Sequence, residues 1–185
     1  MQSDDTEMVR LCVDQFEKAD NMTDTSAAIR ALVNSAAEAA QGAKEKALIE
    51  FYNRWSDEAL VIDQWFSIQA ASTLPDALEQ VKNLMTHAAF DNKNPNRLRS
   101  LVVTFCFQNI ANFHRNNGEG YAFLADRVIE VDAFNPQMAA RILSPLTHWG
   151  KYDEQRQELM KAELNRILET PDLSENVFEI ASKSV

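Results

Sequence analysis

The sequence has few of the residues that interrupt helices or build reactive centres. Its 185 residues include 4 glycines, 5 prolines, 2 cysteines and 3 histidines. The glycines are isolated, so the chain has no glycine-rich loop for binding phosphate groups. Cys12 and Cys106 lie far apart, which argues against a disulfide framework and fits a reducing compartment. No metal or cofactor site is therefore suggested by these residue types.

Long apolar runs and an excess of basic residues are also missing. No run approaches the length of a membrane span, and the first residues, MQSDDTEMVR, are too acidic for a signal peptide. We therefore expect a cytoplasmic chain without a membrane partner. With 18 Lys and Arg against 28 Asp and Glu, the net charge is −10. Binding to nucleic acid is not expected, because it requires basic patches that neutralise phosphates.

No catalytic constellation is apparent. His87, His114 and His148 are not spaced as an H-E-x-x-H zinc pair, so we expect surface or hydrogen-bonded structural histidines. A nucleophilic pair of Cys106 with His114 is conceivable. However, Cys106 lies within an apolar run, and we assign it to the core. The sequence thus predicts no catalytic, cofactor-binding or metal-binding residue.

What the sequence does have is helical periodicity. Apolar residues recur at spacings of three and four, and strong helix formers dominate the composition. We expect about nine or ten helices joined by short turns, with the aromatic residues in the core. The expected helices cover 5–19, 27–36, 48–55, 59–69, 75–85, 95–108, 121–134, 136–148 and 153–170, and a short last helix begins at Ser174. Thr23 or Asp24 is expected to cap the second of these helices, and Gly42 to interrupt the chain before the third. The aromatic core candidates are Trp55, Trp65, Phe66, Phe105, Phe107, Phe113 and Tyr121.

Two of the helix starts share an Asn-Pro pair. Asn94-Pro95 and Asn135-Pro136 lie 41 positions apart, which is close to the period of helical-pair repeats. We therefore predict an all-α fold in which stacked antiparallel helix pairs form an α-solenoid-like superhelix. A compact bundle is the alternative.

Arginines follow both of these starts, in NPNRLRS (94–100) and NPQMAAR (135–141). A helix start carries partial positive charge, so a cation there costs about 0.3–1 kcal/mol. The ordinary explanation is that Arg99 and Arg141 pair with Asp91 or Asp132. Arg97 is expected to be a surface residue.

Several longer strings resemble a known family. They are NMTDTSAAIRALVNSAAE, VIDQWFSIQA, NPNRLRSLVVTFCFQN, FHRNNGEGYAFLAD and NPQMAARILSPL, and they are similar to the carboxy-terminal part of bacterial aminopeptidase N. The resemblance begins at about residue 21 and is less distinct over 1–20. It implies that residues 1–185 are a fragment of the fourth, all-helical domain of a gluzincin-type zinc aminopeptidase.

In that family the fourth domain forms a cap over the active-site chamber. The resemblance therefore implies that zinc and the catalytic residues lie in another part of the parent enzyme. The chain is expected to be inactive alone. Its implied partners are the catalytic and other domains of the same aminopeptidase, and a peptide substrate.

The resemblance also suggests a role for the arginines. Arg99, Gln137 and Arg141 match residues that line the substrate channel, and Gln137 and Arg141 share one helix face because they are four apart. Free N–H groups and a guanidinium suit a peptide's carboxylate and carbonyl groups. The competing function is a stand-alone helical scaffold that binds a protein partner through a concave face.

Overall fold

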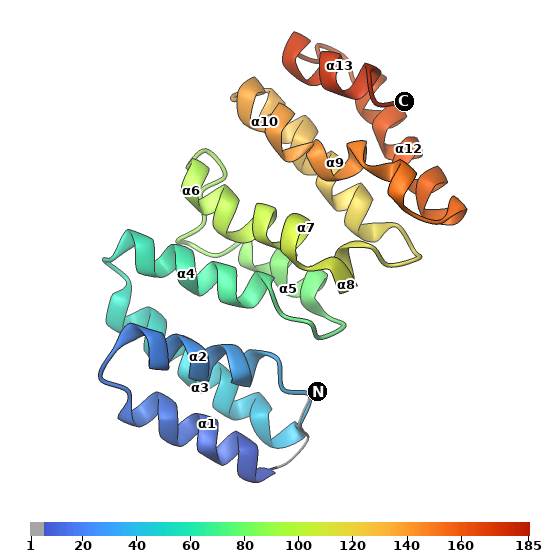
Figure 1. The fold of residues 1–185 in the computed structure, drawn as a ribbon. Coiled ribbons are helices and arrows are strands. Elements are labelled where there is room, and N and C mark those ends of the chain that lie inside the picture. Colours follow the sequence, from blue (N-terminus) through green and yellow to red (C-terminus); the bar gives the residue numbers. More distant parts are fainter. Residues whose placement is uncertain (1–5) are drawn as a thin grey trace.

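The computed structural model describes residues 6–185, and every regular element in that range is helical (Figure 1). The first elements are α1 (Thr6–Lys18), α2 (Met22–Val33), α3 (Glu38–Trp55), α4 (Ala59–Ala70) and α5 (Ala77–Leu84). A long helical segment then combines α6 (Pro95–Leu98), the π-helical turn η1 (Arg99–Val103) and α7 (Thr104–Gln108). The last elements are α8 (Ile110–Phe113), α9 (Glu119–Asp132), α10 (Pro136–Ile142), α11 (Ser144–Thr147), the 3₁₀ turn η2 (Trp149–Lys151), α12 (Glu154–Leu168) and α13 (Glu175–Ser182).

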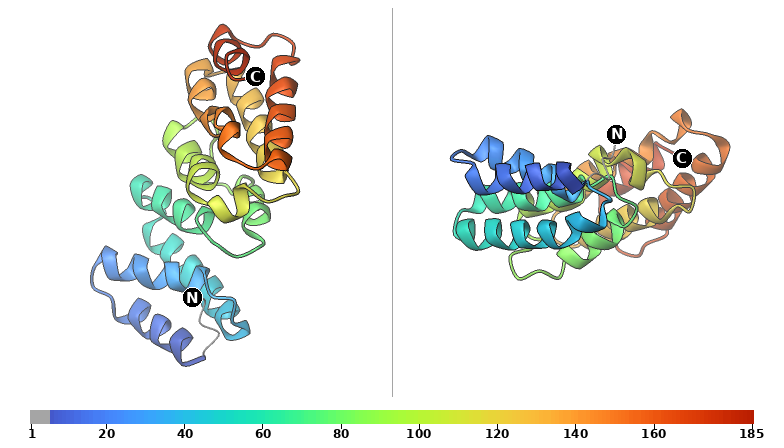
Figure 2. Two further views of the ribbon diagram at one scale, coloured as in Figure 1. Left: turned by 45° about the vertical axis from the view of Figure 1, so that its right-hand side comes forward. Right: turned by 90° about the horizontal axis from the view of Figure 1, so that it is seen from below.

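These helices form antiparallel pairs that stack one upon another. The pairs are α1 with α2, α3 with α4, α5 with the α6–α7 segment, α9 with α10, and α12 with α13. Helices at equivalent places in successive pairs also touch: α2 packs on α4, α4 on η1, α9 on α12 and α10 on α13. The result is an elongated stack with α1 at one end and α13 at the other (Figure 2). The predicted α-solenoid is confirmed, and the compact bundle is not what forms.

Side-chain hydrogen bonds repeat with the same period as the helix pairs. Gln64 Nε2 donates to Ser26 Oγ at 2.7 Å, and the hydroxyl of Tyr152 lies 2.9 Å from His114 Nε2; both bonds span 38 positions. The 41-residue spacing of the Asn-Pro starts therefore reflects real repeats. Each pair is tied to the next by side chains as well as by apolar packing.

The aromatic residues form much of the core. Phe66, Phe105, Phe113 and Tyr121 are completely buried. Trp65 is 6% exposed and donates its Nε1–H to the carbonyl of Leu48 at 3.0 Å. The prediction is wrong for Phe107, which is 40% exposed. None of the helices within residues 6–185 combines the length and apolar content needed to cross a membrane.

Two predicted boundaries near the amino end are also wrong. Asn21 caps α2, accepting a hydrogen bond from the Asp24 N–H at 2.9 Å, so neither Thr23 nor Asp24 is the cap. Gly42 lies inside α3 and does not interrupt it. A glycine weakens a helix by only about 1 kcal/mol, and the packing of α3 against α1, α2 and α4 exceeds that cost. Residue Asp5, where the first predicted helix begins, lies outside the described residues.

Candidate functional site

The two Asn-Pro starts have the cap geometry that the sequence predicts. Asn94 Oδ1 accepts from the N–H groups of Asn96 and Arg97, at 3.0 and 3.4 Å. Asn135 Oδ1 accepts from the N–H of Met138 at 3.1 Å. Both helices are the second member of their pair, so both starts lie on the same side of the stack, where α6 and α10 begin (Figure 1).

Arg97 is not the surface residue that the sequence suggested. Its side chain is only 12% exposed and forms an ion pair with Asp63, whose side chain is 17% exposed. Arg97 also donates to the carbonyls of Ala89 and Ala59, at 3.0 and 2.9 Å. Three acceptors thus hold this guanidinium between α6 and α4, and its role is to join two repeats.

Arg99, Gln137 and Arg141 are all exposed. Within residues 6–185, no side-chain hydrogen bond or ion pair is formed by Arg99 or Arg141. The expected pairing with Asp91 or Asp132 is wrong, since neither carboxylate contacts these arginines, and both accept hydrogen bonds from other residues. Asp91 accepts from the N–H of Lys93 at 2.9 Å, and Asp132 accepts from the N–H of Ser174 at 2.8 Å and from its hydroxyl.

The two arginines differ in their helical setting. Arg99 begins the π-helical turn η1, so the backbone widens at this residue. Such turns are rare and often occur at functional sites. Nothing in the sequence predicts this turn, since RSLVV has ordinary helical character.

Arg141 lies in the last turn of α10, where the helix dipole carries partial negative charge, and not at the positively charged start of the helix. α10 is only seven residues long. It ends because Pro145 has no N–H to donate to the carbonyl of Arg141. A cation in a last turn is favourable, so the expected electrostatic cost at Arg141 is wrong in sign.

The histidines are structural where they are buried. The Nδ1 of His114 is 2.9 Å from the Tyr121 hydroxyl, and its ring stacks on Tyr152 at 4.2 Å. Burial, aided by the nearby charge of Arg156, lowers the pKa of His114 to about 4. His87 accepts the N–H of Ala89 through Nδ1 at 3.1 Å. The histidine prediction is confirmed for these two residues.

Cys106 does not form a reactive pair with His114. It is 2% exposed, and burial raises the pKa of its thiol well above the ordinary value. Both nitrogens of His114 are already engaged by the hydroxyls of Tyr121 and Tyr152. The assignment of Cys106 to the core is confirmed.

The described residues do not fit a zinc ion. Between residues 6 and 185, no three His, Cys, Asp or Glu side chains gather closely enough to hold a metal. Since a catalytic zinc needs three protein ligands, no step of a zinc mechanism can be built on this part of the chain.

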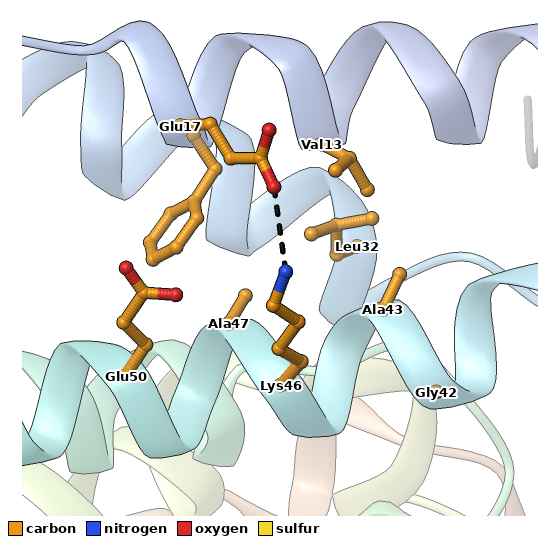
Figure 3. Close-up of a pocket in the computed structure, with 9 residues that line it drawn as sticks. Val13, Glu17, Leu32, Gly42, Ala43, Lys46, Ala47 and Glu50 are labelled. Atoms are coloured by element: carbon orange, nitrogen blue, oxygen red, sulfur yellow. Dashed lines mark hydrogen bonds and ion pairs between the residues drawn. The ribbon is translucent and has the colours of Figure 1, made fainter.

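A cavity of about 180 Å³ lies between α1, α2 and α3 (Figure 3). Val13, Phe16 and Leu32 supply apolar walls. Lys46 Nζ reaches across to Glu17 at 3.4 Å, as the dashed line in Figure 3 shows. No histidine, cysteine or hydroxyl group lines this cavity, so it offers apolar contact and charge but no nucleophile.

The chain is similar in sequence to the aminopeptidases N of several bacteria. The chain is 47% identical over 172 residues to aminopeptidase N of Caulobacter vibrioides, 41% identical over 170 residues to that of Haemophilus influenzae, and 40% identical over 172 residues to that of Escherichia coli. Each match covers 92% of this chain and 19% of the relative. The chain thus spans about a fifth of the length of these relatives.

A solved structure agrees. The crystal structure of Legionella pneumophila aminopeptidase A in complex with aspartic acid superposes with a TM-score of 0.89 at 36% identity, over 96% of this chain and 20% of that one. The resemblance to the carboxy-terminal helical part of aminopeptidase N is therefore confirmed. The family model described as "Domain of unknown function (DUF3458_C) ARM repeats" matches residues 1–185, and the chain belongs to that family.

Proposed function

We propose that residues 1–185 form the non-catalytic helical domain of a zinc aminopeptidase, where they cover the active-site chamber and line the path of the peptide. The observation that carries the proposal is that Arg99, Gln137 and Arg141 are exposed, and that within residues 6–185 neither arginine forms an ion pair with Asp91 or Asp132. Two guanidinium groups thus remain available in a chain whose net charge is −10.

The chemistry of these side chains suits a peptide. A guanidinium presents a planar set of donors that matches a carboxylate or a backbone carbonyl. Gln137 and Arg141 are one helical turn apart on α10, so they can contact successive groups of an extended chain. The π-helical turn at Arg99 is a further local departure from regular structure on the same side of the stack.

The rest of the reaction belongs to other parts of the proposed enzyme. The relatives have about four fifths of their length outside the matched region. Zinc, the catalytic residues and the binding site for the amino end of the peptide are expected there. This chain is expected to have no peptidase activity by itself, and its partners are those other domains.

The test is made in the full-length aminopeptidase that carries this chain. Arg141→Ala should lower kcat/KM for a tetrapeptide roughly tenfold, because one charge-assisted hydrogen bond in a solvated chamber is lost, with an upper limit of about a hundredfold. A single-residue alanyl anilide should be cleaved within about twofold of the wild-type rate, since it does not extend beyond the first subsite.

Arg30→Ala is a matched control. Arg30 is also an exposed arginine in the last turn of its helix, α2, but it lies away from the Asn-Pro starts. This variant should leave both substrates unaffected. Equal losses on the tetrapeptide and the anilide in Arg141→Ala would refute the channel role.

A further inference from the structure

A second cavity, of about 190 Å³, lies where α7 and α8 meet the connection formed by α11 and η2. We call it the α7–η2 groove. Its lining residues are Cys106, Phe107, Ile110, His114, Ser144, Pro145, His148, Lys151 and Tyr152. Its lining residues from α7 and α8 lie at the end of the α6–α7 segment that is opposite the Asn-Pro start of α6. None of its nine lining residues is one of the proposed channel residues Arg99, Gln137 and Arg141.

The rim of this groove exposes apolar side chains. Phe107 is 40% exposed and Ile110 is 57% exposed. They flank Asn109, where the helix breaks and α8 begins in a new direction. Asn109 Nδ2 donates to the carbonyls of Ala70 and Ser72, at 3.0 and 2.7 Å, so the break is anchored to the preceding repeat. The exposed side chains of Phe107 and Ile110 therefore flank a helix break that is fixed by hydrogen bonds.

The charge of the lining is unusual for this chain. None of the nine lining residues is acidic, although the chain has 28 Asp and Glu. Lys151 and His148 are exposed at the rim, and Tyr152 adds a hydroxyl next to the His114 ring. An apolar group with a neighbouring carboxylate would complement such a surface in both shape and charge.

We propose that the α7–η2 groove docks an apolar side chain, flanked by Asp or Glu, from the remaining portion of the same aminopeptidase polypeptide. The inference rests on the proposed function, because it requires the chain to be one domain of a larger enzyme. About four fifths of each relative lies outside the matched region, so a large covalently linked partner is available. A tethered partner has a high effective concentration, so a groove of this size suffices for docking.

The test measures the accessibility of Ile110 in the full-length enzyme. Ile110→Cys is reacted with a maleimide, and labelling at this position is quantified by peptide mass mapping. If the groove is occupied, labelling in the native enzyme should be at least about tenfold slower than in denaturant, because the side chain reacts only during local opening. Leu60→Cys gives the rate for a side chain that residues 6–185 leave uncovered, since Leu60 on α4 is 77% exposed.

Two results would overturn the proposal. Labelling of Ile110→Cys as fast as that of Leu60→Cys would show that the groove is open to solvent. Protection that appears only at high protein concentration would show that a second copy fills it. Neither result depends on peptidase activity, so the docking proposal can fail while the peptide-path proposal stands, or the reverse.

A second substitution tests the charge of the partner. Adding Lys151→Glu to the Ile110→Cys enzyme should speed labelling by about tenfold, because like charges would then face each other across the groove. Lys93→Glu is the control, since Lys93 is an exposed lysine in the loop between α5 and α6. An unchanged labelling rate with Lys151→Glu would refute the acidic partner.

Discussion

The junctions on the two sides of the α5–α7 pair use opposite chemistry. Toward α4, the buried guanidinium of Arg97 pairs with the carboxylate of Asp63. Toward α9 and α12, the uncharged ring of His114 is held between two tyrosine hydroxyls. Both junctions connect neighbouring repeats across 34 to 38 positions. One backbone period therefore accommodates either charged or neutral contacts, and the two kinds of contact should fail under different conditions.

The two Asn-Pro helices show why the charged contact forms at α6 and has no counterpart at α10. Arg97 and Met138 both lie three positions after the capping asparagine. Both point into the stack: the Arg97 side chain is 12% exposed and Met138 is 6% exposed. The position therefore faces other helices in each repeat. An arginine is tolerated there only because Asp63 and two backbone carbonyls meet it.

The largest effect is expected from breaking the charged junction. Arg97→Ala should destabilise the chain by about 3–5 kcal/mol, because the Asp63 carboxylate remains mostly buried without its partner. Urea unfolding followed by circular dichroism measures this loss. The double variant Arg97→Met with Asp63→Ala should recover much of it, since neither charge is then stranded. A loss below about 1 kcal/mol in Arg97→Ala would mean that the pair behaves like a surface ion pair.

Acid should act on the neutral junction. The pKa of His114 is lowered to about 4 by burial and by Arg156, against about 6.5 in the unfolded chain. Between those values the unfolded state binds a proton that the folded state does not, so stability falls as the pH drops from about 6.5 to about 4. The loss should be roughly 2 kcal/mol, allowing for incomplete burial.

The measurement compares unfolding free energies over that pH range in wild type and in His114→Gln. The values for His114→Gln are subtracted from those for wild type, because carboxylates titrate in the same pH range and affect both proteins. The variant should show a shallower dependence on pH. His148→Gln, at an exposed histidine, is the control and should keep the wild-type slope. Identical slopes in wild type and His114→Gln would contradict the neutral junction.

A smaller and equal effect is expected at the two caps. Asn94→Ala and Asn135→Ala should each cost about 1 kcal/mol, because each removes a side-chain acceptor from a helix start. Replacement by Ser should restore most of the stability. Similar losses, measured by urea unfolding, would show that the two starts are energetically alike although the side chains that follow them differ. Losses that differ by more than about 1 kcal/mol would show that the starts are not equivalent.

Much of this architecture is predictable because it depends on local sequence. The Asn-Pro caps, the helical period and the burial of Phe66 and Tyr121 follow from residues within one or two turns. The missed features depend on distant partners. Arg97 meets Asp63 from 34 positions away, and nothing in NPNRLRS indicates that contact.

Two other features that differ from the prediction have a local cause. Gly42 stays within α3 because its neighbours are strong helix formers and a single glycine costs little. Phe107 is exposed because it follows the buried Phe105 by two residues and so lies about 200° around α7 from it. The channel role of Arg99, Gln137 and Arg141 follows from the family resemblance and stays a prediction. Their exposure could not be derived from spacing alone.

The smallest effect concerns Arg141, where the structure reverses the expected sign. Near a helix start, removing the cation would stabilise the fold. In the last turn of α10, Arg141→Ala should instead cost about 0.3–0.5 kcal/mol, because the guanidinium opposes the negative end of the helix. Urea unfolding, with Arg30→Ala in the last turn of α2 as the matched control, measures both losses, and they should be similar. A gain in stability would show that the partial positive charge at the start of α10, near Pro136, has the larger effect on Arg141. A loss above about 2 kcal/mol would reveal a structural partner for Arg141, and any effect on tetrapeptide cleavage would then follow from misfolding rather than from a lost contact with the peptide.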